Sequence, residues 1–223
     1  MTKTLFLTGA SSGIGAATAR AAAKAGWNIG LFARSEDKLN DLAAEIGDQA
    51  LVLVGDATDY DAQKQALDKL ADHFGEVDAA FANAGRGTSP AGTENGDPQD
   101  WKAMVDLNIM GALYTAHAAM PHLRKTTGQY VVTGSAAGRV HIQGSIYGAT
   151  KWFIHGFAGN LADEMAEWGG RCMVVSPGMV DTAFFDEAKP DKLHPEDVAA
   201  AVMHALEAPA RASIREIHLM PTD

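Results

Sequence analysis

Short apolar or β-branched runs alternate with longer helix-like segments along the chain, and this alternation restricts the fold more than any other sequence feature. Turn-forming residues bound each run. Seven runs have the character of strands: Thr4–Thr8, Asn28–Ala33, Ala50–Val54, Val77–Ala82, Gln129–Thr133, Cys172–Ser176 and Glu216–Met220. Six segments have the character of helices: residues 13–25, 35–47, 59–74, 98–124, 147–168 and 195–208. Repeated strand–helix–strand units predict an α/β fold, a doubly wound parallel sheet of about seven strands with helices on both faces.

Three of these helices begin with recognisable signals. Thr58 and Asp61 have the spacing of a capping box, although aspartate is a weaker partner there than glutamate. The pairs Asp97-Pro98 and His194-Pro195 place proline in the first helical turn, where its missing N–H leaves no bond unmade. No repeat or Pro/Ser-rich linker interrupts the pattern, so we expect residues 1–223 to form a single domain.

Composition and charge argue against several classes of function. The net charge of -10 would repel the phosphates of a nucleic acid, so we expect no nucleic-acid partner. No apolar stretch approaches the ~20 residues that span a bilayer, and the early apolar run at Leu5–Leu7 breaks at once into a turn. We therefore expect neither a membrane span nor export. The single Cys172 lies in a strand-like run and suits a buried thiol in a reducing cytoplasm.

A glycine-rich turn, Gly9-Ala10-Ser11-Ser12-Gly13-Ile14-Gly15, follows the first strand and opens the first helix. In this context backbone N–H groups can face a pyrophosphate, because glycine allows a close approach. A dinucleotide is favoured over a mononucleotide, since the Gly-Lys-Ser/Thr of a P-loop is absent from the turn. Taken alone, the turn also fits a tight strand-to-helix connection that binds nothing.

With Thr8 ahead of it, this glycine spacing resembles that of the short-chain dehydrogenase/reductase family. Further motifs extend the resemblance over nearly the whole chain: Asp56, Asn83-Ala84-Gly85, Asn108, Ser135, Tyr147-Gly148-Ala149-Thr150-Lys151 and Pro177-Gly178-Met179-Val180-Asp181-Thr182. The resemblance implies a Rossmann-type fold and an NAD(P)-dependent oxidoreductase that acts on CH–OH and C=O groups. Two features depart from the family pattern: Ser135 precedes Tyr147 by twelve residues rather than about thirteen, and the short C-terminal part leaves little chain for a large substrate lid.

Tyr147 and Lys151 are four residues apart on a predicted helix, so both side chains can reach a common site. A free tyrosine has a pKa near ~10, and we expect the lysine and an oxidised nicotinamide to lower it. The resemblance implies that Tyr147 is the acid/base and that Lys151 tunes it and holds the nicotinamide ribose. It further implies that Ser135 stabilises the reacting oxygen, while Asn108, in a distorted helix, anchors a water next to Lys151. Taken singly, these residues also fit a solvated helix pair, a turn-forming serine and a surface asparagine.

The second strand ends at Ala33-Arg34, where an NAD site usually carries an acidic residue and a 2′-phosphate needs a cation. Arg34 therefore favours NADP (NADPH), with NAD as the alternative if this arginine only points to solvent. By resemblance, the other cofactor-binding residues lie in three groups. They are Asp56 and Ala57 near the adenine, Asn83, Ala84 and Gly85 under its ribose, and Pro177, Gly178, Val180 and Thr182 near the nicotinamide.

Two irregular stretches, Arg86–Asp97 and Thr182–His194, follow strands and are the expected substrate walls. Arg86 suits either a substrate carboxylate or phosphate, or simply the surface. Met179, Phe184 and Phe185 suggest an apolar side of the pocket, or else core or subunit contacts, and His141 could line the pocket. The eight histidines have no ligand set around them in the sequence, so we expect no metal.

These features together predict hydride transfer between a nicotinamide dinucleotide and a small carbonyl or alcohol substrate. An NAD-linked alcohol or hydroxy-acid dehydrogenase is the alternative enzyme. A non-catalytic dinucleotide sensor is the alternative from another class, although binding alone does not require a proton path. The helices near residues 98–124 and 147–168 resemble the pair that forms the main subunit contact in the family, which implies a homotetramer or homodimer.

Overall fold

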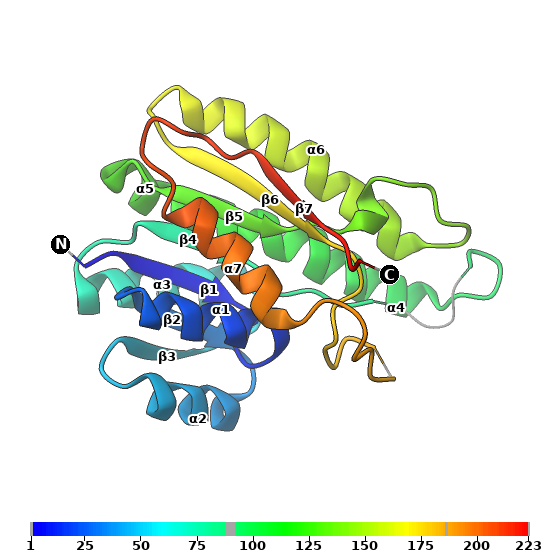
Figure 1. Ribbon diagram of the computed structural model, residues 1–223, viewed down its shortest axis with the longest axis horizontal. Coiled ribbons are helices and arrows are strands. Elements are labelled where there is room, and N and C mark those ends of the chain that lie inside the picture. The colour runs from blue at the N-terminus through cyan, green and yellow to red at the C-terminus, as the bar shows by residue number, and fades with distance from the viewer. Residues whose placement is uncertain (1, 88–91, 186, 223) are drawn as a thin grey trace.

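The computed structural model describes residues 2–87, 92–185 and 187–222. Its centre is one sheet of seven strands in the order β3-β2-β1-β4-β5-β6-β7, with every neighbouring pair parallel (Figure 1). The strands are β1 (Thr4–Thr8), β2 (Asn28–Ala33), β3 (Ala50–Val54), β4 (Ala79–Ala82), β5 (Gln129–Thr133), β6 (Arg171–Pro177) and β7 (Glu216–Leu219). This arrangement confirms the predicted doubly wound α/β fold.

Helices cover both faces of the sheet. They are α1 (Gly13–Lys24), α2 (Glu36–Ile46), α3 (Tyr60–Phe74), α4 (Pro98–Val105), α5 (Ala112–Thr126), α6 (Ile146–Ala166) and α7 (Pro195–Leu206). One buried layer joins the sheet to α1, α2 and α7, which lie in front of it in Figure 1, and the other joins it to α3, α5 and α6. Among the described residues, no helix is long and apolar enough to cross a membrane.

The central strands are apolar on both sides because each side meets a helical layer. In β1, Leu5 and Leu7 pack into the layer of α1 and α7, while Phe6 between them packs into the opposite layer. In β2, Leu31 packs into the layer of α1 and α7, and Phe32 packs into the opposite layer. Alternate side chains of a strand point to opposite faces, so near-continuous apolar runs are what a parallel sheet covered on both sides requires.

The structure corrects three details of the predicted elements. β4 begins at Ala79 rather than Val77, because the Asp78 carboxylate accepts the N–H of Thr4 at 2.8 Å and ties the strand start to β1. The capping box expected at Thr58 and Asp61 is absent; Asp59 caps α3 instead and accepts from the N–H of Ala62.

The third correction concerns the helix predicted over residues 98–124. It is interrupted by a π-helical turn at Asp106–Gly111, which separates α4 from α5. The starts expected at Asp97-Pro98 and His194-Pro195 are both present, and the Asp197 carboxylate accepts the N–H of His194 at 2.8 Å.

Candidate active site

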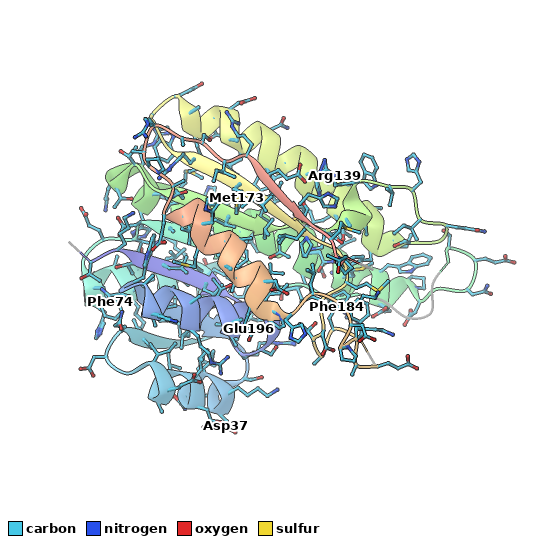
Figure 2. All side chains as sticks on the ribbon, in the orientation of Figure 1. Asp37, Phe74, Arg139, Met173, Phe184 and Glu196 are labelled. Carbon is cyan, nitrogen blue, oxygen red and sulfur yellow. The ribbon has the colours of Figure 1, made fainter. Side chains whose placement is uncertain are left out.

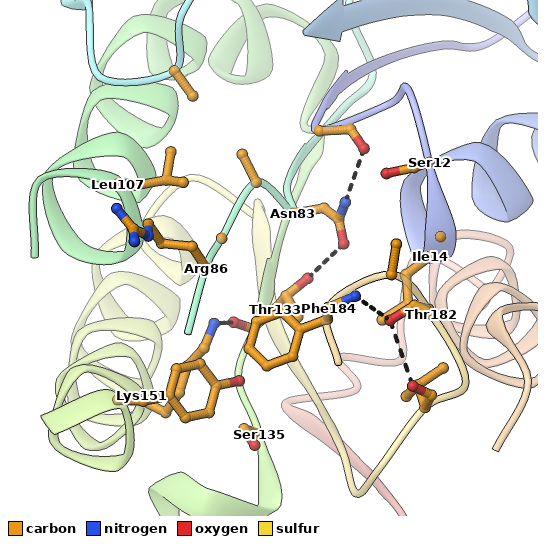
Figure 3. Close-up of a pocket in the computed structure, with 18 of the residues that line it drawn as sticks. Ser12, Ile14, Asn83, Arg86, Leu107, Thr133, Ser135, Lys151, Thr182 and Phe184 are labelled. Atoms are coloured by element: carbon orange, nitrogen blue, oxygen red, sulfur yellow. Dashed lines mark hydrogen bonds between the residues drawn. The ribbon is translucent and has the colours of Figure 1, made fainter. Parts of the chain in front are cut away.

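A cleft of about 980 Å³ opens at the carboxyl ends of the strands, where the sheet order reverses between β1 and β4 (Figure 3). Ligands of open α/β sheets bind at such a reversal, because neighbouring loops diverge there. All the predicted cofactor-binding residues except Gly15 line this cleft, as do Ser135, Tyr147 and Lys151. The fold thus brings together side chains that lie far apart in the sequence.

The glycine-rich turn forms one wall of the cleft. Gly9 has a φ of +68°, and a Cβ on Gly15 would lie 2.1 Å from the carbonyl oxygen of Gly9, so the turn tolerates no side chain at Gly15. The Ser12 side chain makes no capping hydrogen bond to α1. The first turn of α1 therefore presents backbone N–H groups and the positive end of its dipole to the cleft, an arrangement suited to a pyrophosphate.

Asn83 fixes the loops after β1, β4 and β5 to one another. Its amide nitrogen lies 3.2 Å from the Thr8 carbonyl oxygen. Its amide oxygen accepts from the Thr133 hydroxyl at 3.1 Å (Figure 3). The Thr8 hydroxyl oxygen accepts in turn from the backbone N–H groups of Asn83 and Ala84. This residue therefore shapes the cleft through bonds within the chain.

Tyr147 and Lys151 project from the same side of α6, with the lysine ammonium 5.6 Å from the centre of the tyrosine ring. Lys151 is only 4% exposed, and its Nζ donates to the carbonyl oxygen of Thr133 at 2.7 Å. Burial lowers the pKa of Lys151 to about 8. Burial also raises the pKa of Tyr147 above its ordinary value, and the Ser135 side chain works in the opposite direction. Within the chain itself the tyrosine pKa is therefore raised by desolvation, and the lowering expected from Lys151 is not found.

Asn108 lies behind the cleft wall rather than in it, inside the π-helical turn. Its Oδ1 accepts from the N–H of Arg86 and its Nδ2 donates to the carbonyl oxygen of Arg86, both at 2.9 Å. Nδ2 also reaches the hydroxyl of Thr150 at 3.1 Å, and that hydroxyl donates to the carbonyl oxygen of Tyr147. The distorted helix thus ties the loop after β4 to the helix that carries Tyr147.

Arg34 stands at the β2 end of the cleft with its side chain 78% exposed. Its guanidinium lies 3.8 Å from the Asp56 carboxylate, which also accepts from the N–H and hydroxyl of Thr58. The arginine side chain is therefore oriented toward a second predicted cofactor residue, and its exposure leaves most of its N–H groups accessible.

Met179, Phe184 and Phe185 also line the cleft and come from the loop after β6. Figure 2 labels Phe184 in this loop. Arg86 lines the cleft, but its guanidinium forms a short ion pair with Asp100 of α4. His141 does not line the cleft and stacks on Trp152 instead, at 5.6 Å between ring centres. Of the two stretches expected to form substrate walls, residues 88–91 and 186 lie outside the described residues.

Sequence reasoning missed His155, which lies one helical turn beyond Lys151 and directly under the Ser135 turn. Its Nε2 is 3.3 Å from the carbonyl oxygen of Ser135 and 3.2 Å from the hydroxyl of Ser176. Its Nδ1 faces the Glu216 carboxylate of β7 at 3.7 Å. Burial lowers the pKa of His155 and thereby favours the neutral ring. The spacing 147, 151, 155 on one helix was the available signal, because residues four apart share a face.

Comparison with known proteins places this site among oxidoreductases. A family model described as short chain dehydrogenase matches residues 3–193. Sulfoacetaldehyde reductase 2 of Chromohalobacter salexigens is 35% identical, and the alignment covers 100% of this chain and 95% of that protein. Serine 3-dehydrogenase of Agrobacterium fabrum is 34% identical with the same coverage.

Solved structures give the same result. The alcohol dehydrogenase of Thermococcus sibiricus complexed with 5-hydroxy-NADP matches with a TM-score of 0.91 at 29% identity, covering 100% of this chain and 97% of that one. The closed form of a serine dehydrogenase complexed with NADP+ matches with a TM-score of 0.91 at 26% identity, covering 98% and 94%.

Proposed function

This chain belongs to the short-chain dehydrogenase family, and we propose that it interconverts a small carbonyl compound and its alcohol with a nicotinamide dinucleotide, NADP(H) in preference to NAD(H). The observation that carries this proposal is the placement of Tyr147, Lys151 and Ser135 on one wall of a cleft whose other wall is the uncapped start of α1. One wall offers proton transfer and the other offers phosphate binding.

The residues of the cleft fit a dinucleotide. The first turn of α1 suits the pyrophosphate, and the surface formed by Asn83, Ala84 and Gly85 suits the adenosine half. When bound there, the nicotinamide would supply or accept the hydride. Tyr147 would give its proton to the carbonyl oxygen during reduction and take it back during oxidation, with the Ser135 hydroxyl donating to the same oxygen. The buried ammonium of Lys151 would favour the phenolate left on Tyr147.

The preference for NADP rests on Arg34. A 2′-phosphate carries nearly two negative charges, and an accessible guanidinium can meet it with charge-assisted hydrogen bonds. Similar proteins of known structure were solved with 5-hydroxy-NADP, with NADP+ and with NADH, so they support a nicotinamide dinucleotide, and the choice of NADP rests on Arg34. Asp56 faces Arg34 and would partly compensate its charge, so the preference is expected to be moderate.

The test is nicotinamide absorbance with a panel of aldehydes, ketones and alcohols and with each dinucleotide, for the wild type and Tyr147→Phe. Turnover by the wild type, lost in Tyr147→Phe while dinucleotide affinity stays within a few-fold, supports the proposal. Equal turnover by the variant would remove Tyr147 as the acid/base. Tight dinucleotide binding with no turnover of any substrate would favour the sensor function instead.

A further inference from the structure

Large apolar side chains that remain exposed gather at one end of the cleft. Among the described residues, the large hydrophobic side chains with substantial exposure are Val54, Val140, Ile142, Trp152, Phe153, Met179, Phe184 and Met220. Half of them line the cleft, namely Ile142, Met179, Phe184 and Met220. They come from three separate segments: the loop before α6, the loop after β6 and the end of β7. Exposed apolar groups converging on one site mark a binding surface rather than chance scatter.

Phe184 holds the central position in this group. Its ring centre lies 5.5 Å from that of Tyr147 and 5.3 Å from that of Phe185. Phe184 lines the cleft and is labelled among its lining residues in Figure 3. Its backbone N–H reaches the Thr182 hydroxyl at 3.3 Å, which holds the start of the loop. An apolar ring therefore stands directly beside the proposed acid/base.

Gly87 leaves the space that the ring occupies. A Cβ on Gly87 would lie 3.1 Å from Cζ of Phe184, a tighter contact than side chains normally make. In the described part of the two loops, Phe184 after β6 thus lies against Gly87 after β4, and its ring forms an aromatic edge at this end of the cleft.

The cationic groups around this end already face partners within the chain. Among the described residues, the lysines and arginines that line the cleft are Arg34 at its far end, Arg86 and Lys151; Arg86 is paired with Asp100, and Lys151 donates to the Thr133 carbonyl oxygen. An anionic substrate would have to compete for these groups, whereas an apolar substituent gains by covering the exposed rings.

From these contacts we infer that the carbonyl substrate carries an uncharged, apolar substituent that packs against Phe184, and that Phe184 and Gly87 determine substrate specificity. This inference rests on the proposed function. In the reduction, the carbonyl carbon receives a hydride from the reduced dinucleotide, which is thereby oxidised, and the carbonyl oxygen receives a proton from Tyr147, which solvent replaces. The product is the corresponding apolar alcohol, so the named substrates of the relatives, sulfoacetaldehyde and serine, are expected to be poor ones here.

The experiment compares kcat/KM for propanal, butanal, hexanal and benzaldehyde with that for sulfoacetaldehyde, using reduced dinucleotide. We expect kcat/KM to rise by about fourfold for each added methylene until the apolar end is filled. Sulfoacetaldehyde should lie about 100-fold or more below hexanal, because its sulfonate would be desolvated against the rings.

Two variants and one control test whether Phe184 and Gly87 cause the dependence of kcat/KM on chain length. Phe184→Ala should flatten the dependence on chain length, and Gly87→Ala should alter it by displacing the ring. Val54→Ala shortens an exposed apolar side chain outside the cleft (51% exposed against 43% for Phe184) and should leave the dependence unchanged.

Preference of the wild type for sulfoacetaldehyde over the neutral aldehydes would overturn the inference while leaving the proposed function intact. An unchanged chain-length dependence in Phe184→Ala would overturn the role of this residue. No oxidation of either dinucleotide with any carbonyl compound would instead defeat the proposed function itself.

Discussion

Lys151 lies buried under Tyr147, and its ammonium has one backbone carbonyl as its hydrogen-bond acceptor. Burial disfavours the charged form and brings its pKa down to about 8. In the unfolded chain the same group keeps a pKa near ~10.4. At neutral pH the folded protein therefore holds Lys151 in its charged form, which its buried surroundings disfavour. This desolvation penalty is the cost of keeping a cation beside the phenol.

The desolvation penalty on the Lys151 ammonium gives a stability prediction with a definite pH dependence. Between pH 8 and about 10.4 the unfolded chain binds more protons at this site than the folded one, so stability rises with pH there and the penalty is complete below pH 8. The penalty is roughly 3 kcal/mol, partly offset by the bond to Thr133. Lys151→Met should raise the Tm of the ligand-free protein at pH 7 by about 2–6 °C, with the gain shrinking toward pH 10. Thermal unfolding from pH 7 to 10 checks this, and destabilisation at every pH would contradict it.

Arg34 gives a second prediction at the scale of one residue. Arg34→Ala should weaken NADP binding by about tenfold, the low end for a charge-assisted bond because the side chain is mostly exposed, and should leave NAD binding nearly unchanged. Adding Ala33→Asp should reverse the preference, because a carboxylate accepts from the ribose hydroxyl and repels the phosphate. Titration with both dinucleotides at low and high salt measures both effects. Equal losses of affinity for NADP and NAD in Arg34→Ala would show that Arg34 acts on groups that the two dinucleotides share.

At the scale of elements, sequence periodicity located the strands well because each is a short apolar run bounded by turn residues, and the central strands are buried on both faces. Periodicity did not reveal the π-helical turn at Asp106–Gly111, since apolar spacing continues across it; only the family resemblance predicted a distorted helix at Asn108, and that prediction is confirmed. Contacts between distant segments stabilise that turn, chiefly the two hydrogen bonds between the Asn108 side chain and the backbone of Arg86. The cap expected at Thr58 was wrong because Asp59, one residue later, accepts the N–H of Ala62 instead.

His155 shows how one helix can position two groups of the site. It lies on the helix that carries Tyr147, and it contacts the Ser135 carbonyl oxygen from below. Gly134 and Gly138 leave room for its ring, because a Cβ on either would lie about 3 Å from it. We predict that His155→Leu lowers kcat by about tenfold to hundredfold through misplacement of the Ser135 hydroxyl, while the KM for dinucleotide stays unchanged.

The matched variant His155→Gln keeps a side-chain N–H that can reach the same carbonyl oxygen. It should recover most of the lost kcat if positioning of Ser135 is the role of His155. Steady-state kinetics for both variants, with Tm as a control on folding, separate this from a general loss of stability. An equal loss of kcat in both variants would argue against the hydrogen bond.

At the scale of the whole molecule, the cleft is assembled from loops that follow most strands of the sheet. The sequence predicted which residues line it, because parallel strands bring their carboxyl ends to one edge and motif order fixes which loop is which. Pairings between distant segments, such as Arg86 with Asp100 and His155 with Glu216, could not be predicted. They depend on helix orientation and on side-chain conformations that no local pattern encodes.

The outer face of α6 leads to a prediction about assembly. Trp152 and Phe153 are exposed there, Phe153 stacks on Phe157, and Gly156 has open space above it, so a partner could approach closely. We expect a homodimer or homotetramer of the 23.5 kDa chain in which this face is buried.

Phe153→Asp should shift the mass measured by light scattering toward 23.5 kDa, because a carboxylate buried in an apolar contact is costly. Val54→Asp, an exposed apolar position at the far edge of the sheet, should leave the mass unchanged. A wild-type chain that is already monomeric at micromolar concentration, or a Phe153→Asp variant that assembles as the wild type does, would place the subunit contact elsewhere.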